Sequence, residues 1–232
     1  MGLDDLKKEV KYGWDLRKES RGWTEVRGFL TGAQARFKII DRTLYIYVLH
    51  TNELIDWVTN FKATSYTEKF NDNMEFTAHT GFSIAATELH SKIRDILAAR
   101  GFFEFDKVFI SGYSQGGSIA PLLALRLALT YQKMPFICIA MEGAKYIKQV
   151  NFKLANLKVY NIINGNDIVT KLPFWFHKYD ECIYIGKKRH WWKTGLVFRY
   201  DKTEKGIRKF IDLPEHQWAS FENSLNNWLE AR

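Results

Sequence analysis

Gly112-Tyr113-Ser114-Gln115-Gly116 carries more structural information than any other stretch of this chain. It follows the apolar run Val108-Phe109-Ile110, and residues 117–125 after it are small or apolar. This pattern predicts a strand, a tight turn with one serine at its apex, and a helix. Such a turn strains the serine backbone, and the flanking glycines let strand and helix pass close together. It would present the Ser114 hydroxyl at the C-terminal edge of a sheet, beside a helix N-terminus that stabilises negative charge.

Strand-like and helix-like segments alternate along the rest of the chain. Two strands joined by Asp41-Arg42 are predicted first, and the other strands and the helices follow the same patterns of apolar residues. The predicted strands are 36–40, 43–49, 136–140 and 159–163, and the predicted helices are 82–100, the segment from Ser114 to about residue 131, and 218–229. The alternation predicts an α/β fold with a mainly parallel sheet, helices on both faces and an antiparallel edge hairpin.

Three other segments carry weaker patterns. Residues 1–35 are polar with scattered apolar positions, which indicates short helices packed over one end. Residues 52–61 have apolar residues at helical spacing. The basic, tryptophan-containing segment 187–193 lies between strand-like runs at 182–185 and 196–200, so we expect it to form the turn of a solvated hairpin.

Length and composition limit the class of protein. The chain has 232 residues, 46% of them hydrophobic, which fits a single domain over 1–232. Its first residues are charged and no stretch is apolar enough to span a bilayer, so we expect a cytoplasmic protein. Cys138 and Cys182 are expected to be buried free thiols. The net charge of +8 is moderate; we expect no nucleic-acid partner, and a weak contact with a membrane surface is the alternative use of the basic segment.

A serine nucleophile needs a base and a carboxylate that orients the base. Asp167 is the best candidate for the acid, because it directly follows a β-branched strand in a turn that contains Gly165. It should therefore emerge at the same sheet edge as Ser114. A turn aspartate that only caps local amides is the alternative role, and Asp180 is the reserve candidate for the acid.

The base must follow the acid in the chain if the order is that of hydrolase sheets, Ser, then Asp or Glu, then His. His177, His190 and His216 satisfy this order. His216 is preferred because it lies in a loop directly before the last predicted helix, from which an imidazole can reach over the sheet. The other reading of each is an ordinary surface histidine.

An acyl-transfer intermediate also needs two backbone N–H donors for its oxyanion. One is expected from Gln115, directly after the serine. The second is expected from Thr51, which follows the strand that ends at Val48-Leu49-His50 and whose hydroxyl could assist.

Taken together, these residues resemble the class 3, fungal-type triacylglycerol lipases of the α/β-hydrolase superfamily. The most specific match is Asn164-Gly165-Asn166-Asp167-Ile168-Val169-Thr170-Lys171-Leu172-Pro173, close to the acid-bearing motif of that family. The other matches are Val48-Leu49-His50-Thr51 with Asp56-Trp57, His79-Thr80-Gly81-Phe82, the serine turn, and His216 before a terminal helix. The chain departs from the family at Leu49-His50, where Arg-Gly is usual, and at Glu142-Gly143-Ala144-Lys145-Tyr146.

The resemblance implies a serine carboxylic ester hydrolase, a lipase or carboxylesterase, that uses the catalytic triad Ser114, Asp167 and His216 and needs no metal or organic cofactor. Acylglycerols or related lipid esters would be its substrates, and residues 52–61 would resemble a lid helix or be an ordinary surface helix. Phospholipids, thioesters or small soluble esters remain open as substrates of the same triad. A catalytically silent hydrolase fold that serves as a binding or scaffold module is the alternative from another class.

Overall fold

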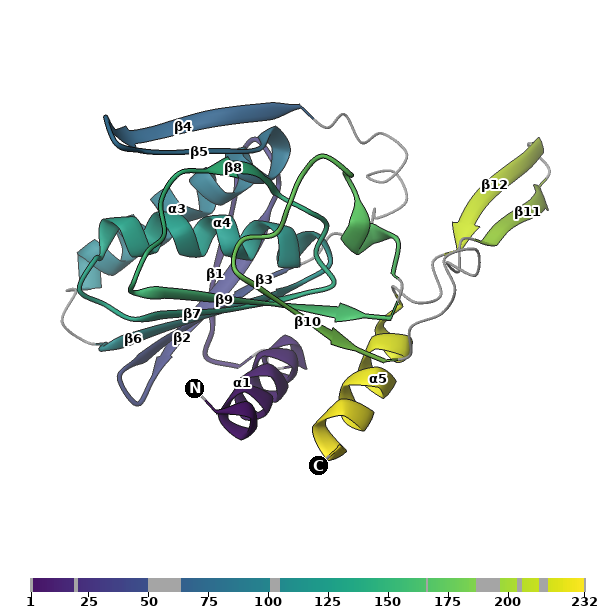
Figure 1. Ribbon diagram of the computed structural model, residues 1–232, viewed down its shortest axis with the longest axis horizontal. Helices are drawn as coiled ribbons and strands as arrows, with labels where there is room; N and C mark the ends of the chain where they lie inside the picture. Colours follow the sequence, from purple (N-terminus) through teal and green to yellow (C-terminus); the bar gives the residue numbers. More distant parts are fainter. Residues whose placement is uncertain are drawn as a thin grey trace.

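The computed structural model describes residues 2–18, 21–49, 64–100, 105–165, 167–186, 197–203, 206–212 and 217–231, and for 197–212 it describes the backbone alone. A central sheet with helices above and below forms the body of the molecule (Figure 1). The chain therefore has the α/β architecture that the sequence predicts, and it is the fold of the α/β-hydrolases.

The central sheet has seven strands. They are β1 (Thr24–Arg27), β2 (Gln34–Ile40), β3 (Thr43–Val48), β6 (Lys107–Tyr113), β7 (Phe136–Met141), β9 (Leu157–Asn164) and β10 (Glu181–Ile185), in the spatial order β1-β2-β3-β6-β7-β9-β10. The five strands from β3 to β10 are parallel, and β1 and β2 form the antiparallel edge. Asp41 and Arg42 join β2 to β3 with φ angles of 45° and 57°, the left-handed conformation of a two-residue hairpin turn.

Two layers of helices cover the sheet. Helices α3 (Thr80–Arg100) and α4 (Gln115–Thr130) lie on one face, and α1 (Leu3–Asp15) with α5 (Trp218–Glu230) lie on the other (Figure 1). Each face has its own apolar core: Phe82, Leu89 and Leu123 belong to one, Trp14 and Phe221 to the other. Helix α4 is buried from Gly116 to Ala128, which explains its almost continuous apolar sequence.

Two smaller sheets and two short 3-10 helices complete the described structure. Strands β4 (Ser65–Asn71), β5 (Met74–His79) and β8 (Ile147–Val150) form a three-stranded antiparallel sheet on the α3–α4 side (Figure 1). Strands β11 (Val197–Thr203) and β12 (Gly206–Asp212) pair with each other. The 3-10 helices are η1 (Leu16–Lys18) and η3 (Val169–Lys171).

Several predictions need correction. Strand β1 lies within residues 1–35, where only helices were predicted; Val26 is its one buried side chain, which is too weak a pattern to recognise. The β4–β5 hairpin was also not predicted, because most of β4 is exposed. The predicted hairpin across 182–200 was wrong, since β10 pairs in parallel with β9 and β11 pairs with β12.

The two cysteines are free thiols, as expected, but only Cys138 is buried. The prediction that Cys182 is buried was wrong. Cys182 lies in β10, the outermost strand of the sheet, whose Glu181 and Cys182 side chains are both exposed.

Candidate active site

Ser114 lies at the junction of β6 and α4, in the strand–turn–helix unit that the sequence predicts. Its backbone has φ 57° and ψ −120°, a combination that few non-glycine residues adopt. The N–H of Ser114 donates to the carbonyl oxygen of Met141 at 2.9 Å, and this hydrogen bond ties the turn to the neighbouring strand β7. Only 2% of Ser114 is exposed to solvent. The serine is therefore held in a strained conformation by a rigid frame.

The glycines around Ser114 are required by close backbone contacts. A Cβ on Gly112 would lie 2.4 Å from the carbonyl oxygen of Gly116, and one on Gly116 would lie 2.3 Å from that of Val48. A Cβ on Gly117 would lie 2.4 Å from the carbonyl oxygen of Met141. These contacts fix the start of α4 against the ends of β3, β6 and β7, as the glycines in the sequence predict.

Gln115 is the first residue of α4, so its backbone N–H lies at a helix N-terminus, where the backbone dipoles favour negative charge. This placement fits the predicted oxyanion donor. Thr51, the second predicted donor, and the possible lid at 52–61 lie outside the described residues. The described end of β3 nevertheless passes directly over the serine turn, because Val48 pairs with Gly112 and contacts Gly116.

Asp167 is buried, with 1% of its surface exposed, three residues after the end of β9. Its Oδ1 accepts a hydrogen bond from the Val169 N–H at 2.9 Å, and its own N–H donates to the Asn164 carbonyl oxygen at 3.1 Å. The Thr170 hydroxyl donates to the Asp167 carbonyl oxygen at 2.8 Å. Because β6 and β9 are parallel members of one sheet, their C-terminal ends place Ser114 and Asp167 at the same edge.

The reserve acid Asp180 lies elsewhere. It precedes β10, at the edge of the sheet opposite to Ser114, where its carboxylate pairs with Lys153 at 3.2 Å and accepts the Val159 N–H at 3.1 Å. This position excludes Asp180 as a partner of Ser114. His177 is exposed and its backbone pairs with Ile147, while His190 and His216 lie outside the described residues.

The start of α5, two residues beyond His216, lies against both sides of the candidate site. The rings of Trp218 and Tyr113 pack edge to face with centroids 5.5 Å apart, and Tyr113 directly precedes Ser114. Two residues further along α5, the Ser220 hydroxyl accepts a hydrogen bond from the Asn164 side chain at 3.2 Å, and Asn164 ends β9 just before the Asp167 turn. The first turn of α5 thus contacts the strand ends that carry Ser114 and Asp167.

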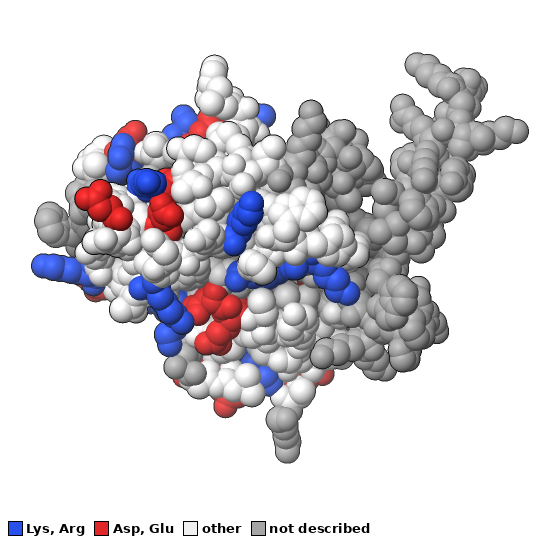
Figure 2. Space-filling view, turned by 45° about the horizontal axis from the view of Figure 1, so that its top comes forward, with Lys and Arg blue, Asp and Glu red and all other residues white. Residues whose placement is uncertain are grey.

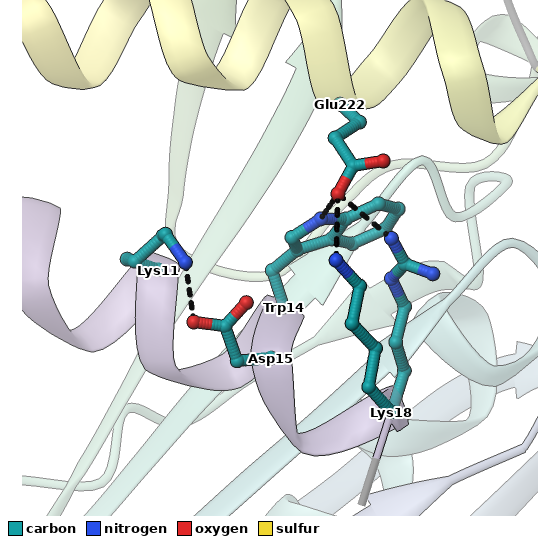
Figure 3. A network of polar contacts seen from close by, with 6 residues as sticks. Lys11, Trp14, Asp15, Lys18 and Glu222 are labelled. Atoms are coloured by element: carbon teal, nitrogen blue, oxygen red, sulfur yellow. Dashed lines mark hydrogen bonds and ion pairs between the residues drawn. The ribbon is translucent and has the colours of Figure 1, made fainter.

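A polar network holds α5 in this position. Glu222 Oε1 on α5 accepts hydrogen bonds from the Trp14 indole at 3.2 Å, the Arg17 guanidinium at 3.1 Å and the Lys18 ammonium at 3.0 Å (Figure 3). The lysine and arginine lower the pKa of the Glu222 carboxyl. These contacts join the last helix to the first one, so the chain is already fixed where it enters α5.

Glu142 is a buried residue of the site to which the sequence analysis assigned no role. It follows β7 at the same sheet edge, is 0% exposed, and has a φ of 53°. Its carboxyl group lies close enough to the Asp167 side chain to interact with it, and its Oε1 accepts the Asn164 N–H. Burial and then the Asp167 carboxylate raise the pKa of Glu142 well above its usual value, although the Asn164 N–H and Lys178 oppose this. A carboxylate directly after an apolar strand was the signal in the sequence.

The Lys178 ammonium group is close enough to these two carboxyl groups to interact with both. It donates hydrogen bonds to the carbonyl oxygens of Gly143 and Ala144. Burial lowers the pKa of Lys178 to about 8, and the charges of Glu142 and Asp167 act in the opposite direction. Tyr113, on the other side, has its pKa raised by burial and by the same two carboxyl groups.

His79 begins the His-x-Gly-Phe segment and lies at the end of β5. Its ring packs against Phe82 and Phe176, with centroids at 4.5 and 5.8 Å, and burial lowers its pKa to about 4. His79 is therefore a neutral histidine of the core at physiological pH. Its main-chain N–H donates to Tyr146 at 2.9 Å, which joins the small sheet to the chain after β7.

Among the described residues, neither the distribution of charged side chains nor the placement of metal-binding side chains indicates a second functional site. Lys and Arg side chains alternate with Asp and Glu side chains over the described part of the face in Figure 2. Within the described ranges, no group of three or more His, Cys, Asp or Glu side chains is placed to hold a metal ion. None of the described helices is both long and apolar enough to span a bilayer. The arrangement around Ser114 therefore carries the functional argument.

Comparisons with known proteins agree with this geometry. The sequence model of the family described as Lipase (class 3) matches residues 45–177, more than half of the chain. A comparison with curated protein sequences found no match.

Solved structures show the same fold at low sequence identity. The triacylglyceride lipase of Rhizomucor miehei superimposes with a TM-score of 0.66 at 15% identity, covering 80% of this chain and 82% of that one. A triacylglycerol lipase of Penicillium expansum gives 0.61 at 14% identity, covering 88% and 82%. A triacylglycerol lipase whose catalytic centre is described as a serine protease triad gives 0.60 at 18%, covering 70% and 65%.

Proposed function

Because the chain belongs to the class 3 lipases and is a lipase-like serine ester hydrolase, we propose that it cleaves the carboxylic ester bonds of lipids with Ser114, Asp167 and His216. Ser114 is the nucleophile, His216 the base and Asp167 the acid that orients it. The backbone N–H groups of Gln115 and Thr51 bind the oxyanion.

The reaction then has two halves. His216 removes the Ser114 proton as the oxygen attacks the ester carbonyl carbon, and the resulting imidazolium, stabilised by Asp167, returns the proton to the leaving alcohol. Water, deprotonated by His216, next attacks the acyl-enzyme and releases the fatty acid. The amides of the oxyanion site bear the negative charge in both tetrahedral intermediates.

The placement of the start of α5 is the observation that carries the assignment of His216. Trp218 packs on Tyr113, and Ser220 is bonded to Asn164, so the chain that leaves residue 216 enters a helix already seated between the nucleophile and acid strands. The triad named for the similar triacylglycerol lipase supports the same assignment.

Exposed apolar side chains near this sheet edge support a lipid substrate and contact with a lipid surface. Phe29 and Leu30 are 91% and 78% exposed, in the loop before β2, whose first residues pair with the end of β3. Backbone N–H groups of this loop donate to Glu88, which holds the tip in place. Phe174 and Trp175, also exposed, follow the Asp167 turn. Such side chains favour an apolar partner over water.

Substitution of the nucleophile tests the proposal. Ser114→Ala should abolish hydrolysis of p-nitrophenyl esters, and a fluorophosphonate probe should label wild-type protein at Ser114 alone. Wild-type rates with Ser114→Ala, or an adduct on another residue, would refute the assignment. A panel of esters of increasing chain length, with phospholipid vesicles alongside, separates lipid from small-ester and phospholipid substrates, and zero activity throughout would favour the scaffold alternative.

The contact with a lipid surface has its own test. Trp175→Ser should slow hydrolysis of an emulsified long-chain ester and leave the rate on a soluble short-chain ester unchanged. Leu3→Ser is the matched control, because Leu3 is similarly exposed but begins α1, on the other helical layer. Equal effects of the two substitutions would refute the contact. The cytoplasmic location expected from the sequence remains a prediction.

A further inference from the structure

Two buried carboxyl groups meet behind the candidate triad. Glu142 directly follows β7 and Asp167 lies in the turn after β9, and their side chains are close enough to interact with each other. Neither is exposed by more than 1%. The Asn164 N–H donates to Glu142, and the Val169 N–H donates to Asp167 at 2.9 Å, so the backbone positions both groups.

A hydrogen bond between two carboxyl groups requires a proton on one of them, because two adjacent carboxylates repel each other in a buried site. The surroundings favour Glu142 as the group that holds this proton. Burial and the charge of Asp167 both raise the pKa of Glu142. As a neutral acid, Glu142 is the donor of this hydrogen bond, and Asp167 remains an anion.

We propose that Glu142 is a positioning residue of the active site: its protonated carboxyl group donates a hydrogen bond to Asp167 and fixes the carboxylate that orients His216. This inference rests on the proposed function, since it takes Asp167 as the acid of the triad. The Val169 N–H and the Glu142 O–H together hold Asp167 from the side of the protein. A charge-assisted O–H donor is well suited to this task.

The charged groups around Glu142 fit this assignment. Lys178 approaches from the chain after η3 and donates to Gly143, the next residue, so it also fixes the backbone of the turn. Its positive charge balances the single negative charge that the carboxyl pair carries. Tyr113 faces both carboxyl groups from β6 and is neutral, because burial and these groups raise its pKa. One shared proton and one cation therefore leave the described cluster close to neutral.

Two substitutions separate this role from simple packing. Glu142→Gln keeps an amide donor for Asp167 and an oxygen for the Asn164 N–H, so its kcat should stay within about threefold of wild type. Glu142→Met, of similar length, has neither group. Its kcat should fall about 100-fold, the cost of a misplaced catalytic group, while KM changes less than about twofold. Thermal unfolding of each protein confirms that the measured protein is folded.

The outcomes are distinct from those for the proposed function. If Ser114→Ala keeps activity, the proposed function fails. If Ser114→Ala is inactive, two results would refute the positioning role alone. One is a wild-type kcat for Glu142→Met, and the other is a loss of kcat in Glu142→Gln as large as that in Glu142→Met. Infrared spectroscopy tests the protonation state without relying on folding of the Met variant. Wild type at neutral pH should show a protonated-carboxyl C=O band that Glu142→Gln lacks, and absence of that band overturns the proposal.

Discussion

Replacing Glu142 by glutamine should stabilise the protein at neutral pH. The side chain is buried, and burial together with the Asp167 carboxylate raises its pKa in the folded state well above the usual value for a glutamate. In the unfolded chain the same group ionises near that value. Folding at neutral pH therefore takes up a proton, and this uptake weakens the folded state. Glutamine has nearly the same shape and no proton to bind.

The size of the effect follows from linkage. Above the unfolded pKa the folded state binds one proton more than the unfolded state, so the free energy of unfolding falls by about 1.4 kcal/mol for each pH unit until the folded pKa is reached. From about pH 5 to about pH 7, the wild type should lose stability relative to Glu142→Gln, by at most about 2.5 kcal/mol if the folded state keeps the proton over this whole range. Lys178 does not contribute in this range, because its lowered pKa of about 8 lies above it.

Urea unfolding of both proteins at about pH 5, 6 and 7, followed by tryptophan fluorescence, measures the difference. Titrating groups far from Glu142 are unchanged between the two proteins, so their effects cancel in the difference. A difference that stays constant to within about 0.5 kcal/mol over this range would show that Glu142 is ionised in the folded protein. That result would refute the reasoning on the shared proton.

Three further predictions concern the frame of the site. Gly116→Ala should destabilise the protein by about 3 kcal/mol or prevent folding, because the new Cβ would lie 2.3 Å from the carbonyl oxygen of Val48. Gly22→Ala is the control: a Cβ there would meet no atom within 4 Å, so the substitution should cost only about 1 kcal/mol, because Gly22 has a positive φ angle. Equal losses in urea unfolding would contradict this. Burial lowers the pKa of His79 to about 4 in the folded state, so below about pH 6.5 the folded state binds fewer protons than the unfolded one. The free energy of unfolding should therefore fall by about 2 kcal/mol from about pH 7 to about pH 5 relative to His79→Phe, and a parallel pH dependence would show that folding leaves the pKa of His79 unchanged. Glu68→Gln should cost about 3 kcal/mol, because it leaves the buried Arg126 without its carboxylate, while Glu68→Leu combined with Arg126→Leu should recover most of that loss in calorimetry.

Most of the fold follows from local sequence patterns. The serine turn, the hairpin around Asp41 and the helices α3, α4 and α5 have strong apolar periodicity or specific turn residues, and each was predicted close to its observed bounds. Strands β1 and β4 have few buried side chains, so no periodicity marks them. The pairing of β10 with β9 was not predicted, because local sequence patterns do not show which strands pair. The strand-like runs on either side of residues 187–193 fit a hairpin just as well as they fit two strands with other partners.

The candidate site was predictable only in part, for a related reason. Ser114 and Asp167 lie in turns with their own sequence signals, and parallel strands bring such turns to one edge. Glu142 has no motif of its own. Its significance depends on burial and on its contact with Asp167, 25 positions later in the chain, and both are tertiary properties. Likewise, the contact of Trp218 with Tyr113 spans most of the last half of the chain.

Two unfavourable features lie side by side at the edge of the sheet that carries Ser114. Ser114 and Glu142, at the ends of β6 and β7, both have positive φ angles, and Glu142 adds a buried carboxyl group next to Asp167. Each feature destabilises the fold, and each persists only because surrounding contacts fix it. Gly112, Gly116 and Gly117 supply those contacts for the serine. Backbone strain that is held in place by surrounding contacts is frequent at active sites, so the strained turns at Ser114 and Glu142 support the assignment of this edge as the catalytic site.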